Sequence, residues 1–145
     1  MPTVKMHFWT GLSLSIVLAV IAGWATRRSV AEDKVSERVY ELRTYTTLPG
    51  RLPALHKRFA EHTMKLFEKY GMKNEGYWTP TDEQLKDTTL IYIISHDSLE
   101  AAEKSWKAFQ ADPEWQKVRA ASEADGKILA KAPERVYMTK VPWAK

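Results

Sequence analysis

The sequence predicts an α+β fold in which four strands form one antiparallel sheet in split βαβ topology, with both helices on one face. The first observation is the order of the patterned segments between residues 38 and 139: strand, helix, strand, strand, helix, strand. The second is the run Leu90–Ile94, which is apolar or aromatic at every position and therefore typical of a strand buried on both faces. Because one helix layer covers only one face of a sheet, this run predicts a homodimer whose two sheets face each other.

The first predicted strand, residues 38–46, is rich in β-branched and aromatic residues and contains no Gly or Pro. Its period of two gives one face suited to a core, made of Tyr40, Leu42 and Thr44. The opposite face carries an acid, a base and a phenol in a row, namely Glu41, Arg43 and Tyr45. We expect the partner sheet to cover this second face.

The first predicted helix contains apolar residues at helical spacing from Leu52 to Tyr70, a length of about five turns. Gly71 is expected to end it in a left-handed conformation. A short aromatic strand at residues 76–79 and the buried strand at residues 88–95 follow. We expect the first and third strands to be adjacent at the centre of the sheet and, unlike the other neighbours, to run parallel.

The second helical region has two start signals. Asp97 followed by Glu100 fits a capping box, and Asp112 followed by Pro113 fits a cap with proline at the first helical position. The last predicted strand covers residues 135–139. The chain therefore supplies the second helix and fourth strand that the topology requires.

Residues 1–31 are expected to be a signal peptide or a membrane anchor. Residues 6–25 contain no Lys, Arg, Asp or Glu, and small residues at 29 and 31 suit cleavage after Ala31, which would give a secreted or periplasmic protein. Alternatively, residues 6–25 span a bilayer as an uncleaved tether, because Arg27 and Arg28 resist translocation. Residues 32–37 are expected to be a linker, and residues 38–145 the folded domain.

The composition argues against several classes of function. There is no cysteine, so disulfides, thiolate metal sites and cysteine nucleophiles are excluded. Removing Lys5, Arg27 and Arg28 from the 22 basic residues leaves 19 against 18 acidic residues, which argues against a nucleic-acid surface. The sequence also lacks a glycine-rich phosphate loop, a nucleophile elbow and a zinc-binding histidine pair. We therefore expect neither a metal nor a cofactor.

Short segments spread along the chain together resemble the NIPSNAP domain family. In order they are residues 40–45, 49–51, 61–63, 71–73, 76–79 and 112–115. The resemblance implies a ferredoxin-like domain that pairs as a dimeric α+β barrel, in agreement with the burial argument. Related barrels include cofactor-independent monooxygenases, haem-degrading enzymes and muconolactone-isomerase-like proteins, while members of the family itself are linked to mitochondria and vesicle traffic.

The candidate catalytic residues are Glu41, Arg43 and His62. Glu41 and Arg43 lie two positions apart on one strand face, and buried charges are costly unless paired, so they either form a structural ion pair or bind something charged. His62 lies between Phe59 and Leu66 on the apolar face of the first predicted helix and is expected to point at the sheet. It is either a hydrogen-bonded core histidine or a general base or axial ligand.

Three further residues are candidate ligand-binding residues. Tyr45 shares the strand face of Glu41 and Arg43. Trp78 lies on the short aromatic strand, where the alternative role is packing across the dimer, and His96 directly follows the buried strand, where the alternative is helix capping. All three are expected to lie near the cavity between the two sheets.

The sequence thus predicts an exported or membrane-tethered homodimer whose cavity between the sheets binds a small apolar or anionic molecule. One alternative is a cofactor-independent monooxygenase or isomerase, in which His62 or Glu41 moves a proton and Arg43 holds an anionic oxygen. The other is a structural protein-interaction module, for which the cavity would be filled by side chains.

Overall fold

The computed structural model describes residue 3 and residues 38–144. Apart from residue 3, the predicted signal peptide or anchor lies outside these residues, as does the predicted linker at residues 32–37. Within the described part of the chain, no helix combines the length and the apolar character needed to cross a membrane.

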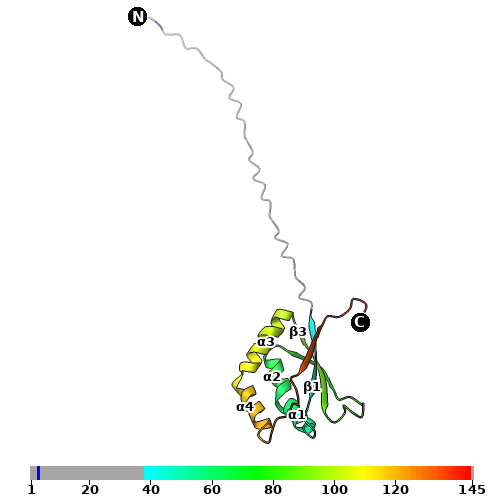
Figure 1. The fold of residues 1–145 in the computed structure, drawn as a ribbon. Helices are drawn as coiled ribbons and strands as arrows, with labels where there is room; N and C mark the ends of the chain where they lie inside the picture. The colour runs from blue at the N-terminus through cyan, green and yellow to red at the C-terminus, as the bar shows by residue number, and fades with distance from the viewer. Residues whose placement is uncertain (1–2, 4–37, 145) are drawn as a thin grey trace. The chain divides into compact units, whose positions relative to one another are not determined.

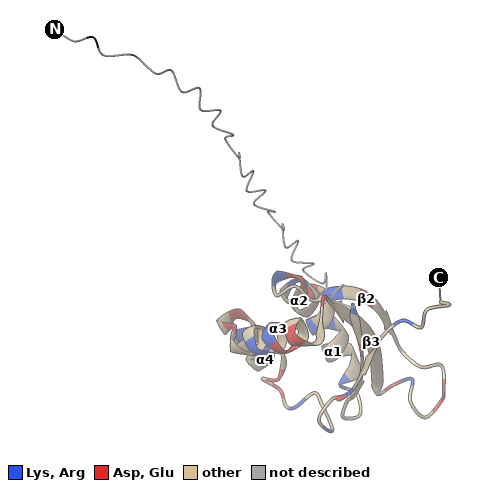
Figure 2. Ribbon diagram, turned by 90° about the horizontal axis from the view of Figure 1, so that it is seen from above, with Lys and Arg blue, Asp and Glu red and all other residues tan. Residues whose placement is uncertain are grey.

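The fold is α+β, with the predicted order of elements (Figure 1). The strands are β1 (Val39–Thr46), β2 (Lys73–Trp78), β3 (Thr89–His96) and β4 (Glu134–Met138). The helical elements are α1 (Leu52–Arg58), the π-helix η1 (Phe59–Thr63), α2 (Met64–Lys69), α3 (Leu99–Ala111) and α4 (Pro113–Ser122). The helices lie together against one face of the sheet (Figure 1), and acidic and basic residues are interspersed along α3 and α4 (Figure 2).

The four strands form one sheet in the order β2-β3-β1-β4, and every adjacent pair is antiparallel. The prediction of a parallel central pair is therefore wrong. Each crossover helix makes the strands on either side of it parallel, but the connection from β2 to β3 reverses the chain. The central neighbours β1 and β3 consequently run in opposite directions, as the antiparallel fold class requires.

The prediction for the two faces of β1 is also wrong. Glu41 pairs with Ile94 and Arg43 with Tyr92, and this face lies under the helices, where Glu41, Ile94 and Tyr92 are fully buried. Its charges are tolerated because they bond to one another and to groups from β3 and α3. The other face, called the open face, carries half-buried or exposed side chains: Tyr40, Leu42, Trp78, Ile91, Ile93, Val136 and Met138.

The core between sheet and helices is built largely of aromatic rings. Phe67 lies near its centre, with ring centroids 5.0 Å from Phe109, 5.4 Å from Trp106 and 6.0 Å from Tyr92, in tilted or edge-on geometry. Aliphatic side chains, among them Leu55, surround the rings. This packing ties α2 and α3 to the central strands.

The predicted helix from Leu52 to Tyr70 is interrupted by the π-helix η1. At its end the backbone N–H of Met64 donates to the carbonyl of Phe59, five residues back, and the hydroxyl of Thr63 donates to the carbonyl of Arg58. The extra residue in this turn changes the helical phase. Thr63 therefore takes the inward position, His62 is exposed, and the expectation that His62 points at the sheet is wrong.

Two of the predicted helix boundaries are confirmed and one is displaced. Gly71 has a φ of 76°, as expected for a left-handed C-terminal glycine, and Asp112 caps α4 by accepting the N–H of Glu114 at 2.6 Å. The cap of α3 is Ser98, which accepts a backbone N–H from the first turn at 3.0 Å, while Asp97 is exposed. The N-cap is thus shifted by one residue, and Ala101 at the third helical position cannot complete a capping box.

Candidate functional site

A buried carboxylate organises the polar face of β1. Oε1 of Glu41 accepts a hydrogen bond from Nη1 of Arg43 at 2.7 Å. Oε2 accepts one from Nε1 of Trp106 on α3 at 2.6 Å and one from Nε2 of His96, at the end of β3, at 2.9 Å. These four residues form a connected group, the Glu41 network, in which His96 carries its proton on Nε2 because a carboxylate can only accept.

The network determines the charge of Glu41. Burial alone raises the pKa of a carboxyl group, but the hydrogen bonds from His96 and Trp106 and the positive charge of Arg43 outweigh it, so the pKa of Glu41 is lowered. The carboxylate stays ionised. Glu41 and Arg43 were expected either to form a structural ion pair or to bind something charged, and this arrangement favours the ion pair.

Arg43 connects the Glu41 network to the aromatic core. Its guanidinium carbon lies 4.2 Å from the ring centroid of Trp106 and 5.6 Å from that of Tyr45. The hydroxyl of Tyr92 donates to the hydroxyl of Tyr45 at 3.1 Å. Nη1 of Arg43 is occupied by Glu41, whereas its buried Nε has no hydrogen-bond partner among the described residues.

Arg43 and Tyr45 line a hollow of about 830 Å³, which we call the inner cavity. It is bounded by β1, the helices and the loop that leads into β4. Aromatic rings form much of its wall: Tyr45, Phe59, Phe67, Trp106, Phe109 and Trp115. The inner cavity therefore joins a large aromatic surface to the charged end of the Glu41 network.

A second arginine, Arg58 on α1, also lines the inner cavity. Its side chain is only 3% exposed, and its guanidinium carbon lies 5.4 Å from the ring centroid of Trp115. Nη1 donates to Oγ of Ser122 at 3.2 Å and lies 3.7 Å from Oε1 of Glu123, whereas Nε has no partner among the described residues. Burial lowers the pKa of Arg58, as expected for a charge that its surroundings compensate incompletely.

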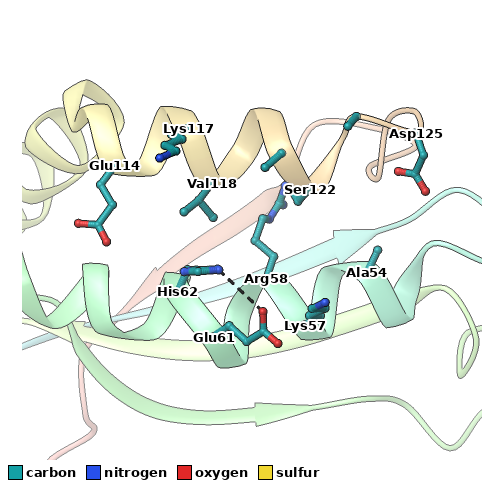
Figure 3. Close-up of a pocket in the computed structure, with 12 residues that line it drawn as sticks. Ala54, Lys57, Arg58, Glu61, His62, Glu114, Lys117, Val118, Ser122 and Asp125 are labelled. Carbon is teal, nitrogen blue, oxygen red and sulfur yellow. Dashed lines mark hydrogen bonds and ion pairs between the residues drawn. The ribbon is translucent and has the colours of Figure 1, made fainter.

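His62 lines a separate groove of about 670 Å³ between α1, η1 and α4 (Figure 3). Its side chain is 44% exposed, and its Nε2 lies 3.8 Å from Oε2 of the adjacent Glu61. Arg58 lines both this groove and the inner cavity, and Figure 3 shows it reaching from α1 towards Ser122 on α4. The structure thus separates His62 from the Glu41 network.

Trp78 lies on the open face of the edge strand β2 and is 52% exposed. Its ring lies over Gly76, where an added Cβ would collide with it. Of the six predicted site residues, the structure brings together Glu41, Arg43, Tyr45 and His96, and places Trp78 and His62 elsewhere.

Sequence reasoning missed Arg58 and the role of Trp106 at Glu41. Arg58 offered a signal, because it follows Leu55 by three positions on the inward side of the predicted helix, where a charge is unexpected. No local signal connects Trp106 to Glu41, which lies 65 residues earlier in the chain. In the part of the chain that the structure describes, no group of three His, Asp or Glu residues is placed to hold a metal ion.

The sequence model of the NIPSNAP family matches residues 40–145. Among solved structures, the chain is similar to an uncharacterized NIPSNAP-like domain protein from Burkholderia xenovorans, with a TM-score of 0.64, 14% identity, and coverage of 76% of this chain and 90% of that one. A second uncharacterized NIPSNAP domain protein from that organism gives a TM-score of 0.62 and 20% identity over 74% and 98% of the two chains.

A Streptomyces coelicolor monooxygenase, solved in complex with nanaomycin D, gives a TM-score of 0.52 and 17% identity over 79% of this chain and 96% of that one. No curated protein sequence matches the chain. The structural likenesses confirm the predicted α+β fold, which these neighbours share.

Proposed function

The chain belongs to the NIPSNAP family, and we propose that it binds a small, largely aromatic or apolar molecule in the inner cavity. The observation that carries this proposal is the hollow of about 830 Å³, whose wall combines aromatic rings with charged and amide side chains. Ligand sites in proteins have this size, and the aromatic part of the wall is typical of them. The proposal places the site inside one chain, under the helices, and not between two sheets as the sequence analysis expected.

Filling the mouth of the inner cavity is expected to weaken binding. Ala132 lines the cavity from the exposed loop before β4, so Ala132→Trp adds a large ring without disturbing the core. In isothermal titration calorimetry, the variant should bind the neutral probe naphthalene-1-carboxamide at least about tenfold more weakly than the wild type does. This corresponds to a loss of roughly 1.4 kcal/mol of binding free energy.

Ala124→Trp is the matched control, because Ala124 lines only the groove that contains His62. It should leave the affinity for the probe unchanged. Equal affinity in the wild type and both variants would place the probe outside the inner cavity. A wild type that binds no probe and carries no retained molecule in native mass spectrometry would refute the proposal.

A cofactor-independent oxygenase is the second candidate function. It is favoured by the hydroxyl pair of Tyr45 and Tyr92 beside Arg43, on a fold similar to that of the Streptomyces coelicolor monooxygenase. In this reading Arg43 holds an anionic oxygen of the substrate at the cavity wall. An oxygen electrode with 1-naphthol as an oxidisable probe tests it, since the absence of oxygen uptake would count against this candidate. The structural-module alternative stays a prediction, because its expected mark, a cavity filled by side chains, concerns the space between two sheets.

We further propose that the open face pairs with the open face of a second copy. The face presents apolar side chains from all four strands, and Val136 on it is 54% exposed. Within one chain the apolar run of β3 is only partly covered, because Ile91 and Ile93 remain half-buried. A two-fold related copy would cover both, as the resemblance to dimeric α+β barrels implies.

Ile93→Glu is expected to convert the dimer into a folded monomer at micromolar concentration. Ile93 lies on the central strand β3 opposite Leu42, so the substitution would bury a carboxylate in each copy against apolar partners. Sedimentation velocity measures the change. Leu99→Glu, an exposed apolar position on α3 in the helical layer, is the control and should remain dimeric. A monomeric wild type would contradict the pairing.

Export or membrane tethering remains a proposal that rests on residues 1–31 of the sequence alone. Native mass spectrometry of protein from its own host tests it together with the dimer. A measured mass that matches a chain beginning at Glu32 would support cleavage and export. A full-length chain in the membrane fraction would support the tether. A full-length chain in the soluble fraction would refute both.

A further inference from the structure

We infer that the inner cavity selects an aromatic carboxylate, whose anionic group is held by Arg58 together with Arg43. This inference rests on the proposed function, because it names the class of molecule that the same cavity takes. It concerns the charge of the ligand, which the aromatic walls by themselves leave open.

The first argument is the hydrogen bonding of the two guanidinium groups. An arginine presents five N–H donors and stays charged in proteins. Nε of Arg43 and Nε of Arg58 are both buried and both lack a partner among the described residues, although each side chain lines the same cavity. These Nε atoms are enclosed by protein atoms, but Nη2 of each arginine also lacks a hydrogen-bond partner among the described residues and is not enclosed, so it can donate to a ligand oxygen in the cavity.

The second argument is the fixed orientation of the two arginines. Arg43 is held by Glu41 and by the ring of Trp106, and Arg58 is held by Ser122 and the ring of Trp115. Both guanidinium groups are therefore immobilised before a ligand arrives. A charge that is already in place loses little conformational entropy on binding.

A third group, the hydroxyl of Tyr45, strengthens the polar side of the cavity. It accepts a hydrogen bond from the hydroxyl of Tyr92, which leaves its own hydrogen available for an acceptor in the cavity. Arg43, Arg58 and Tyr45 thus place donors that suit an oxyanion at the wall of the cavity.

The balance of charge at the cavity wall is positive, which fits an anionic ligand. Arg43 is neutralised by Glu41, whereas Arg58 and Arg119 share the single carboxylate of Glu123, at 3.7 Å and 3.6 Å. The cavity wall, which Lys127 also lines, is thus left with positive charge that no carboxylate of its own neutralises. A carboxylate neutralises it, and its two oxygens suit the planar fork of a guanidinium group. The rings of Trp106, Phe109 and Trp115 then contact the aromatic body of the ligand.

The competing explanation is that Arg58 only joins α1 to α4 through Ser122 and Glu123. That role requires one end of the guanidinium group, and it predicts an effect of substitution on stability alone. The two explanations differ in whether Arg58 distinguishes an anionic ligand from a neutral one of the same shape.

The test compares two planar probes by isothermal titration calorimetry at neutral pH: naphthalene-1-carboxylate, which is ionised, and naphthalene-1-carboxamide, which is not. The wild type should bind the carboxylate about tenfold more tightly or better, as expected for hydrogen bonds between charged partners. Arg58→Gln should abolish this preference and leave the affinity for the amide nearly unchanged. Arg58→Lys keeps the charge and should restore part of the preference. Lys104→Gln, on the exposed side of α3, should behave as wild type.

The outcomes separate this inference from the proposed function. If the wild type binds both probes equally, the inference is overturned while cavity binding stands, and if neither probe binds, both are overturned. A preference that persists in Arg58→Gln removes Arg58 as the anion-binding residue. Should circular dichroism show that Arg58→Gln is unfolded, the ratio of the two affinities in the wild type and in Arg58→Lys decides the question.

Discussion

Glu41→Ala is expected to lower the free energy of unfolding by about 3–5 kcal/mol, the range for breaking a buried ion pair by removing one partner. The substitution would leave Arg43 charged and the ring N–H groups of Trp106 and His96 without their acceptor, all within a fully buried region. Chemical denaturation followed by tryptophan fluorescence measures the change. Glu134→Ala, an exposed glutamate on β4, is the control and should change stability by less than about 0.5 kcal/mol.

Two companion measurements sharpen this prediction. Adding Arg43→Met to Glu41→Ala should recover part of the loss, because the unpaired buried charge is removed. Since the pKa of Glu41 is lowered in the folded state, its contribution is present above the ordinary pKa of glutamate and disappears as the pH falls through the folded value. Glu41→Ala should therefore lose less stability on acidification than the wild type. A loss below about 1 kcal/mol at neutral pH would mean that the network contributes little.

Phe67→Ala is expected to cost a similar amount, about 3–5 kcal/mol, for a different reason. Phe67 is only 1% exposed, and its ring contacts the ring of Phe59 on η1 and the rings of Trp106 and Phe109 on α3. Removing it leaves a void that these rings cannot fill without leaving their own packing. Thermal unfolding, with near-ultraviolet circular dichroism to follow the aromatic packing, measures the effect.

The matched variant is Phe67→Leu, which keeps much of the volume and should cost clearly less than alanine. Because Phe67 also lines the inner cavity, alanine would enlarge that cavity as well as weaken the core. Equal stability of the alanine and leucine variants would contradict the claim that this ring is central to the packing of the core.

The order of elements and several helix ends could be predicted from the sequence, because periodicity, Gly71 and Asp112 are local signals. The sequence did not predict which face of β1 lies in the core. An alternating pattern ranks the two faces by polarity, and Glu41 made its own face look unsuited to a core. The groups that make its burial tolerable, Trp106 and His96, are 65 and 55 residues away in the chain, and only the fold brings them together.

The candidate site was predictable in part for the same reason. Glu41, Arg43 and Tyr45 share a strand face, so their proximity follows from a period of two. His62 and Arg58 depend on the phase of a helix, and apolar residues at both Leu66 and Phe67 fit more than one phase. Spacing alone assigned the inward position to His62, whereas the π-helix gives it to Thr63 and the structure buries Arg58.

The π-helix η1 also bears on how chains of this family can differ in length. Removing one residue from an ordinary α-helix turns everything beyond it by about 100° and would expose one side of the core. Removing one residue from η1, such as the exposed Ala60, would instead turn the wide turn into a regular one, so that α1 and α2 form one continuous helix. We therefore expect η1 to be the point in this helix where an alignment of relatives can open a gap of one residue while Leu55 and Leu66 both keep their places in the core.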